Sequence, residues 1–500
     1  MAVIGILPLA RPTFDVALAE EKLAEMLRRL EDAGHRLIGP RTLLFDGPST
    51  EAALAALARA RPDQLLILQV TFTDAQAVVA AANRFEGPLS IWAVPEPRLG
   101  GRLRLNAFCG LNLASHALAR RQRKFSWLYA APEDADVAGL LAGNRVARAL
   151  PASPTAPEAP AAAAPEAPAA TAPEASADAA PEAPAATAPE ASANAAPEAL
   201  AAAVPAAVAA LRGRRIGRVG AHPDGFDTCA YDAEALERLT GIAVEEIALD
   251  TLFETARAAS PSAAAALHAT AAETLDDLDT VDAGELDQSL RLKLALDTLR
   301  QARSLDAFAI RCWPETFTEY GGAVCGPVSL LGEARVPCAC EADVYGAVTQ
   351  LLLQALADAP VFLVDLVDMD VDDDTGVVWH CGQAPLSMAA ERPTATVHTN
   401  RRMPLLYQFR LKPGPVTLAR ISQAGPEPML VLAEAEMLDR PMAFTGTSGV
   451  LRFPKPVKSV LDRVIASGLE HHMGLVYGAH RAGLIGAARA LNLPILELTA

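Results

Sequence analysis

The chain has 500 residues, a formal net charge of −17 and a pI near 5.0. Its length predicts roughly two to four domains, and its acidic balance, with no compensating basic run, excludes a nucleic acid held through phosphate contacts. We expect a cytoplasmic protein with reduced cysteines and no membrane partner, because the chain opens without a signal-peptide pattern and no stretch reaches the ~18 uncharged apolar residues of a membrane span.

Residues 1–150 alternate between buried strands and amphipathic helices. The runs "VIGILPL", "QLLILQVTF" and "LSIWAVP" are apolar strands, and residues 16–34 and 50–61 have apolar side chains at helical spacing. Strands that alternate with helices of this length predict a parallel sheet with crossover helices. We therefore predict an N-terminal α/β domain over residues 1–150.

The next segment consists almost entirely of Ala, Pro and Glu. It contains a tandem copy, "APEAPAATAPEASADA" at 164–179 followed by "APEAPAATAPEASANA" at 180–195. Frequent proline prevents a continuous helix, and without larger apolar side chains the segment cannot bury enough area to offset its ordering entropy. We predict a disordered insertion over 151–206; a partner-binding Pro-rich motif is the alternative, disfavoured because aromatic and basic residues are missing from it.

After the insertion the α/β pattern resumes and then changes. The runs "RRIGRVG" and "DAFAIRCWPE" predict parallel strands of a second α/β domain over 207–358. From about residue 361 the chain reads as strands and turns, in "VVWHCG", "LLYQFRLKPGPVTLARIS" and "PMLVLAEAEML". This pattern predicts a mostly antiparallel β domain over 359–500, either a barrel or a sandwich, with a helix near its end.

Two acidic residues lie beside very apolar segments. We expect Glu341 where a buried helix begins and Asp365 where a buried strand ends. An unpaired charge is costly there and usually has a cation, a metal or a catalytic role. Together with His380, His471 and His472 they form a ligand set that suits a hard divalent ion such as Mn²⁺ or Mg²⁺. The alternative is that the two adjacent histidines cap a helix.

Other patterns have simpler explanations. The acidic residues beyond Asp368 are typical of a solvated turn. Cys338 and Cys340 form a C-x-C without the paired knuckles of a zinc site, so buried thiols are favoured. The glycines of "GRVGAHPDGFD" at 217–227 do not match a dinucleotide fingerprint and predict a turn.

Five motifs in the second half of the chain form a recognisable set. They are "RCWPE" at 311–315, "CACEADVYGAVTQ" at 338–350, "FLVDLVDMD" at 362–370, "HCGQAP" at 380–385 and "GLEHHMGLVYG" at 468–478. This set resembles the L-fucose isomerase and L-arabinose isomerase superfamily. The most specific parts of the resemblance are the separation of 24 residues between Glu341 and Asp365 and the His-His pair. The similarity covers the whole chain except the Ala/Pro/Glu segment, which departs from the family.

The resemblance implies a fold and an activity. The fold is two Rossmann-like α/β domains followed by a mostly antiparallel β domain. The activity is that of an aldose–ketose isomerase, an intramolecular oxidoreductase, dependent on Mn²⁺ with Mg²⁺ or Co²⁺ as alternatives. It implies a homo-oligomer, a hexamer, trimer or tetramer, with sites near subunit boundaries.

The resemblance also implies ligand roles. The metal is held by Glu341, Asp365 and one of His471 and His472, with a slight preference for His472; the arabinose-type pattern adds His380. Isomerisation moves a proton between C1 and C2 through a cis-enediol, so Glu341 and Asp365 are expected both to hold the ion and to shuttle the proton.

Supporting positions have two interpretations each. Trp313 could stack on a sugar or lie in the core. Glu315 could orient a hydroxyl or cap a loop, and Gln69 could reach a sugar from the end of its strand or be ordinary strand-end polarity. Arg11, like Arg401 and Arg402, is a candidate for an anionic substrate such as sulfoquinovose, which related members use, but surface arginine is the default.

Two other function classes stay open at this point. A non-catalytic sugar-binding or regulatory protein is disfavoured by the acidic and histidine ligand set and by the additional β domain. A metal-dependent epimerase or aldolase would begin with the same proton abstraction, so the ligands alone do not distinguish it.

Overall fold

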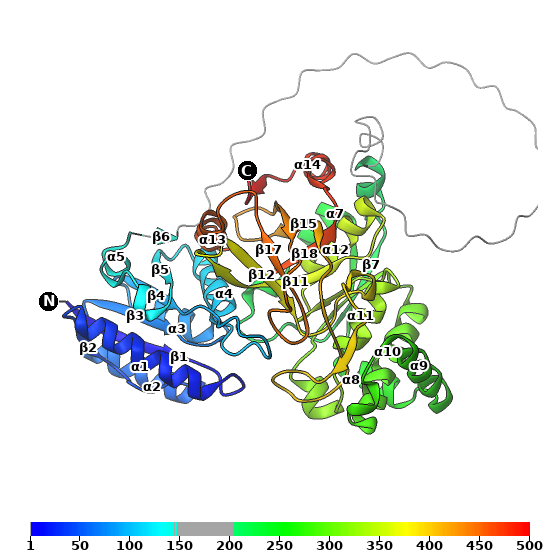
Figure 1. Ribbon diagram of the computed structural model, residues 1–500. Coiled ribbons are helices and arrows are strands. Elements are labelled where there is room, and N and C mark those ends of the chain that lie inside the picture. Colours follow the sequence, from blue (N-terminus) through cyan, green and yellow to red (C-terminus); the bar gives the residue numbers. More distant parts are fainter. Residues whose placement is uncertain (1, 145, 148–203) are drawn as a thin grey trace, which may run out of the picture.

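The structure is a computed structural model that describes residues 2–144, 146–147 and 204–500. The predicted Ala/Pro/Glu insertion, 151–206, lies outside the described residues apart from its last three positions. Of these, Val204 is 8% exposed and belongs to a hydrophobic core. Figure 1 shows the N-terminal domain at one side, the β-rich domain in the middle and the second α/β domain at the other side.

The N-terminal domain is built on a six-stranded sheet in the order β2-β1-β3-β4-β5-β6, parallel except for β6. Its strands are β1 (Val3–Leu9), β2 (Arg36–Ile38), β3 (Gln64–Gln69), β4 (Leu89–Ala93), β5 (Phe125–Tyr129) and β6 (Val146–Ala147). Its helices are α1 (Val16–Asp32), α2 (Gly47–Ala60), α3 (Gln76–Arg84), α4 (Ala107–Arg120) and α5 (Val137–Ala142). The alternation predicted from the sequence is confirmed.

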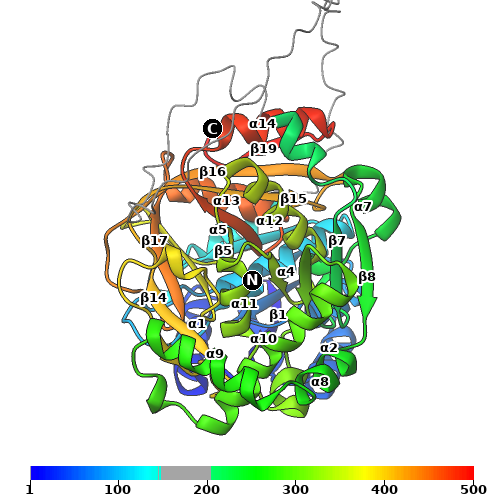
Figure 2. The same ribbon diagram turned by 90° about the vertical axis from the view of Figure 1, so that its right-hand side faces the viewer.

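The second α/β domain has a four-stranded parallel sheet in the order β10-β9-β7-β8. Its strands are β7 (Arg215–Val219), β8 (Ala243–Ile247), β9 (Ala307–Ile310) and β10 (Cys338–Cys340). Its helices are α7 (Ala233–Thr240), α8 (Leu249–Arg257), α9 (Pro261–Thr274), α10 (Ala283–Arg303), α11 (Cys325–Glu333) and α12 (Val344–Ala357). Figure 2 places α8 and α9 at the end of the molecule opposite the C-terminus.

The C-terminal domain is a barrel. Its nine strands run in the order β13-β14-β17-β12-β11-β18-β15-β16-β19, and β16 also pairs with β17. That pairing closes six strands, β17-β12-β11-β18-β15-β16, into a ring, so the predicted alternative of a sandwich does not apply. The strands are β11 (Phe362–Asp370), β12 (Thr375–His380), β13 (Thr394–Thr396), β14 (Leu406–Arg410), β15 (Gly414–Ser422), β16 (Met429–Met437), β17 (Thr447–Arg452), β18 (His472–Tyr477) and β19 (Ile495–Glu497); the helices are α13 (Val457–Ala466) and α14 (Arg481–Ala490).

Two largely buried helices join the barrel to the α/β domains. Residues 107–119 of α4 are all buried, and the helix touches both the N-terminal sheet and β11. Asn112 of α4 donates to the Leu469 carbonyl at 2.6 Å. Position 468 requires glycine, because a Cβ there would come within 2.5 Å of the Ala119 side chain. On the other side α12 packs against β9, β15 and β18. A helix that is apolar all round is a core element, and here each one fixes a domain against the barrel.

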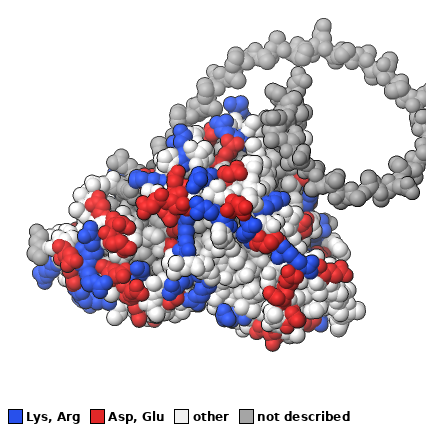
Figure 3. All heavy atoms as spheres, viewed as in Figure 1, with Lys and Arg blue, Asp and Glu red and all other residues white. Residues whose placement is uncertain are grey.

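The surface is charged but mixed. On the face shown in Figure 3, cationic and anionic side chains are interspersed. No helix of the described residues is long and apolar enough to cross a bilayer.

Candidate active site

Glu341 lies in a strained turn between β10 and α12. Its φ is +58° and that of Ala342 is +55°, a backbone region that residues other than glycine seldom adopt. Helix α12 begins at Val344, with the Asp343 carboxylate accepting from the Gly346 amide at 2.9 Å as its N-cap. Glu341 therefore precedes the helix by a tight turn. Strain of this kind, costing on the order of 1–3 kcal/mol, is found most often at functional sites.

The prediction that Asp365 ends a strand is wrong. Strand β11 continues to Asp370, so Asp365 lies within it, opposite His472 of β18 on one side and Trp379 of β12 on the other. The strand tolerates a second carboxylate, Asp368, because Arg98 and Tyr129 bind it. The acidic residues that follow form an exposed turn, as predicted.

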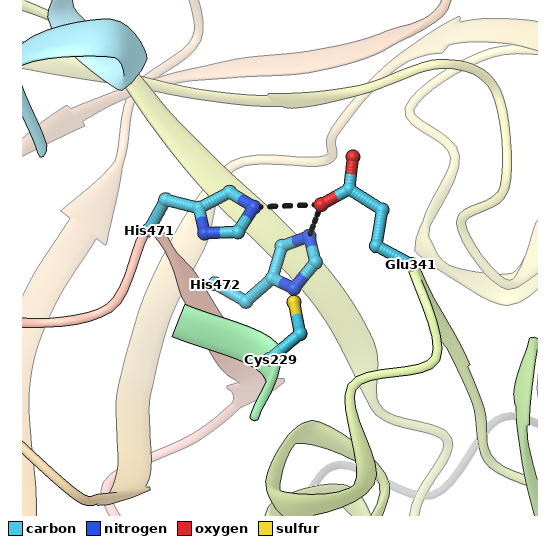
Figure 4. A group of neighbouring side chains, drawn as sticks. All are labelled: Cys229, Glu341, His471 and His472. Carbon is cyan, nitrogen blue, oxygen red and sulfur yellow. Dashed lines mark hydrogen bonds and ion pairs between the residues drawn. The ribbon is translucent and has the colours of Figure 1, made fainter. Parts of the chain in front are cut away.

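Three side-chain nitrogens lie close to the Glu341 carboxylate. His471 Nε2 lies 2.9 Å from Oε2, His472 Nε2 lies 3.8 Å from the same oxygen, and Trp313 Nε1 donates to Oε1 at 3.0 Å. Figure 4 shows both imidazoles pointing at one oxygen of Glu341. Burial raises the pKa of Glu341, but the hydrogen bond and charge of His471 outweigh it and lower the pKa to about 2. Burial opposes protonation of His471, yet the same hydrogen bond raises its pKa overall.

His472 is fixed on one side and open on the other. Its Nδ1 lies 2.9 Å from Asp343 Oδ2, while its Nε2 lies 3.5 Å from Asp365 Oδ1 and 3.8 Å from Glu341 Oε2. A carboxylate at Nδ1 keeps the proton there and leaves the Nε2 lone pair free. That lone pair is directed toward the two carboxylates that the sequence singled out.

A buried ionic network supports this imidazole. Arg420 of β15 is 2% exposed and binds Asp343 through both terminal nitrogens, at 2.6 and 3.0 Å. Its Nε lies 3.4 Å from Glu470, which also accepts from Ser422 Oγ at 2.6 Å. Burial alone raises the pKa of Asp343, but the Arg420 charge and the contact with His472 lower it well below the usual range. The sequence analysis missed Asp343 and Arg420; an arginine inside the apolar strand run "VTLARIS" is the signal that was available.

His380 has a different environment. It ends β12, and its Nδ1 accepts from the Cys381 amide at 2.9 Å, which leaves the proton of a neutral ring on Nε2. The ring stacks on His472 with centroids 5.7 Å apart, and a ligand atom of His380 lies within 4.8 Å of those of Asp365 and His472. A second such group holds Cys229, Glu341, His471 and His472. Among the described residues no such group contains both carboxylates, although an oxygen of each lies near His472 Nε2.

A pocket with about 810 Å³ of empty space opens in front of these side chains. Its lining includes Glu341, Asp365, His380 and His471, the side chains Arg11, Asn400 and Arg401, and several aromatic rings. Trp313 is among those rings, whereas Arg402 is exposed and does not line the pocket.

Two residues predicted to bind substrate, Glu315 and Gln69, do not line this pocket. Glu315 is held by Arg311 through two contacts of 2.7 Å. Gln69 is fully buried and donates to the Thr71 carbonyl at 2.7 Å and to Thr73 at 2.9 Å. The structure thus brings together Glu341, Asp365 and the three histidines, but not these two side chains.

Comparisons with known proteins agree with this architecture. Residues 5–148 match the family model for the N-terminal domain of fucose/sulfoquinovose isomerases. Over its full length the chain is 28% identical to a sulfoquinovose isomerase of Alkalicoccus urumqiensis, with 100% of both chains covered. It is 27% identical to one of Priestia aryabhattai, covering 97% of each chain, and 26% identical to one of Clostridium sp. (strain MSTE9), covering 98% of each. These similarities confirm the predicted resemblance to the fucose isomerase-like superfamily.

Proposed function

We propose that the protein is an aldose–ketose isomerase whose substrate is sulfoquinovose, a glucose with a sulfonate at C6. The full-length relatives that carry this name support the substrate. The observation that carries the chemistry is that Nε2 of His472 is directed at Glu341 and Asp365, 3.8 and 3.5 Å away, while Asp343 holds its other nitrogen.

The residues present suit a divalent metal ion. Asp365 Oδ1 is buried and has no hydrogen-bond partner among the described residues, as expected of an atom that a cation would satisfy. Two carboxylates and one neutral imidazole are a donor set for Mn²⁺, with Mg²⁺ and Co²⁺ as alternatives. Glu341, Asp365 and His472 would hold the ion. When bound, it supplies Lewis-acid stabilisation of negative charge on O1 and O2 of the sugar.

The chain's own groups then move the proton. Glu341 is a carboxylate at neutral pH because its pKa lies at about 2, and Asp365 Oδ1 lies 3.5 Å from His472 Nε2. One carboxylate oxygen takes the proton from C2 of the aldose and returns it to C1, through a cis-enediol, while the hydroxyl proton of O2 passes to O1. Trp313 and His471 keep the Glu341 oxygens oriented by donating to Oε1 and Oε2.

His380 and His471 take supporting roles in this proposal. His471 uses Nε2 to bind Glu341, and His380 uses Nδ1 to accept a backbone N–H, so a neutral His380 presents an N–H and not a lone pair at Nε2. That N–H is suited to donate to a sugar oxygen.

The test is ketose formation by chelator-treated protein, with and without added Mn²⁺, on sulfoquinovose, L-fucose and L-arabinose. We expect turnover of sulfoquinovose that returns with Mn²⁺ and is lost in Glu341→Gln and Asp365→Asn, but not in the exposed control Glu319→Gln. Turnover of all three sugars at equal rates would contradict the proposal that sulfoquinovose is the substrate. Turnover unaffected by complete metal removal would overturn the role of the ion.

A further inference from the structure

The active-site pocket is lined by groups of both charges. Glu341 and Asp365 are among its lining residues, and so are Arg11 and Arg401. Both guanidinium groups face the Trp313 ring, with Cζ atoms 5.2 and 6.0 Å from its centroid. A neutral sugar would need no such pair of cations, because hydroxyl groups are satisfied by uncharged donors and acceptors.

The two arginines differ in what neutralises them. Arg11 Nη2 forms an ion pair with Asp74 at 2.6 Å. The guanidinium of Arg401 has neither a carboxylate nor a hydrogen-bond partner among the described residues, although it is half-buried. Burial, and then the nearby Arg11 charge, lower the pKa of Arg401. A half-buried cation beside another cation is costly unless an anion joins it, and the pocket leaves space for one.

The loop that carries Arg401 is organised around a neutral histidine. His398 Nδ1 accepts from the amides of Asn400 and Arg401, both at 3.2 Å, and the His398 carbonyl accepts from the Arg402 amide at 2.7 Å. Burial and the Arg401 charge lower the pKa of His398 to about 3, so the ring stays an acceptor. The backbone that presents Arg401 is therefore fixed before any ligand arrives, which reduces the ordering cost of binding.

Trp313 contacts both the acidic and the cationic groups of the pocket. Its indole N–H binds Glu341, where C1 and C2 would react, and its ring lies against Arg11 and Arg401. A sugar lying along this ring with its reacting carbons beside Glu341 would direct its far end to the arginines.

We propose that Arg401 is the residue that selects an anionic sugar, by binding the charged group at the end of the carbon chain opposite C1. This inference rests on the proposed function and adds the residue that determines the substrate class. Arg11 assists as a second cation whose charge Asp74 partly offsets. A 6-deoxy sugar without the anionic group leaves Arg401 unpaired, so the pocket rejects it relative to the sulfonated one.

Binding of two sugar alcohols, measured by calorimetry on the full chain, tests this proposal. The alcohols are those of sulfoquinovose and of 6-deoxyglucose, which lack a carbonyl, cannot be isomerised, and differ only in the sulfonate. We expect Arg401→Gln to weaken binding of the sulfonated alcohol by about 10- to 100-fold, the effect of one charge-assisted hydrogen bond. Its affinity for the uncharged alcohol should not change, and Arg401→Lys should restore part of the loss.

Arg402→Gln is the matched control, since it removes an exposed arginine from the same loop. An unchanged dissociation constant in Arg401→Gln would overturn the proposal, and so would an equal loss for both alcohols, which would indicate a disturbed loop. The isomerase assay tests the proposed function independently of these binding measurements. A wild-type protein that prefers the sulfonated alcohol without isomerising sulfoquinovose would contradict the proposed function and leave the role of Arg401 supported.

Discussion

Asp343 and His472 are joined by a 2.9 Å contact between Oδ2 and Nδ1, and both side chains are about 1% exposed. The contact favours the tautomer with its proton on Nδ1, in which the nitrogen that faces Glu341 and Asp365 is an acceptor. An asparagine at position 343 could present its amide N–H to Nδ1 and favour the opposite tautomer.

Asp343→Asn is therefore expected to weaken binding of Mn²⁺ by about 10- to 100-fold, the range for losing such a supporting carboxylate. Titration of the protein with Mn²⁺, followed by electron paramagnetic resonance of the free ion, measures this directly. Asp372→Asn, in the exposed turn after β11, is the control. An Mn²⁺ affinity in Asp343→Asn equal to that of the control would mean that His472 does not depend on this carboxylate.

Arg420→Met should destabilise the fold strongly. It leaves the buried carboxylates of Asp343 and Glu470 without their cation, a loss typically of about 3–5 kcal/mol. The free energy of unfolding from urea titrations is the measurement. Arg440→Gln removes an arginine that is half exposed and pairs with Asp373 at 3.2 Å, and should cost less than about 1 kcal/mol. Equal effects of the two substitutions would show that the buried network contributes no more than a surface pair.

Glu96 should make stability depend on pH. The buried carboxyl holds the turn before α4 by accepting from the amides of Arg104, Leu105 and Asn106. Burial raises its pKa from 4.5 to about 7, against the effect of those hydrogen bonds. A folded-state pKa above the unfolded one means that its contribution is full below pH 4.5 and is lost as the pH rises through about 7.

The free energy of unfolding should therefore fall between these two pH values in the wild type and fall less in Glu96→Gln. Glu133→Gln, an exposed position, should keep the wild-type slope. A Glu96→Gln profile parallel to that of the wild type would mean that the carboxylate stays ionised in the folded protein throughout this range.

Deleting residues 156–198 should leave the melting temperature and turnover unchanged. The prediction comes from the sequence, because the segment is Ala, Pro and Glu without larger apolar side chains to contribute to a core. Differential scanning calorimetry of the deleted protein, beside the full chain, is the measurement. A large fall in melting temperature would contradict it.

Periodicity in the sequence was enough to predict the order of the α/β domains and the β-rich domain. It was not enough for the barrel, since closure depends on β16 pairing with β17 at Glu436 and Met437, which no local pattern encodes. Nor could it choose between His471 and His472. The proposed preference for His472 rests on the register of β18 against β11, where His472 lies opposite Asp365.

The supporting residues were missed for a related reason. Arg420 is 77 positions from Asp343 in the chain, and His472 is 129 positions from it, so their meeting depends on the complete fold. The error at Asp365 came from treating the acidic residues of "VDMD" as the end of a strand, whereas Arg98 of another domain makes Asp368 acceptable inside it.

The residues proposed for the reaction and the residue proposed for substrate selection lie on different parts of the C-terminal domain. Asp365, His472 and Arg420 lie on the adjacent strands β11, β18 and β15 of a closed ring, whereas Arg401 lies in the loop between β13 and β14, which is outside that ring. If Arg401 selects the sugar as proposed, changes in this loop would alter the choice of sugar without moving the groups proposed to hold the metal and to move the proton. A lineage with this architecture can acquire new substrates by varying one short connection while the chemistry stays the same.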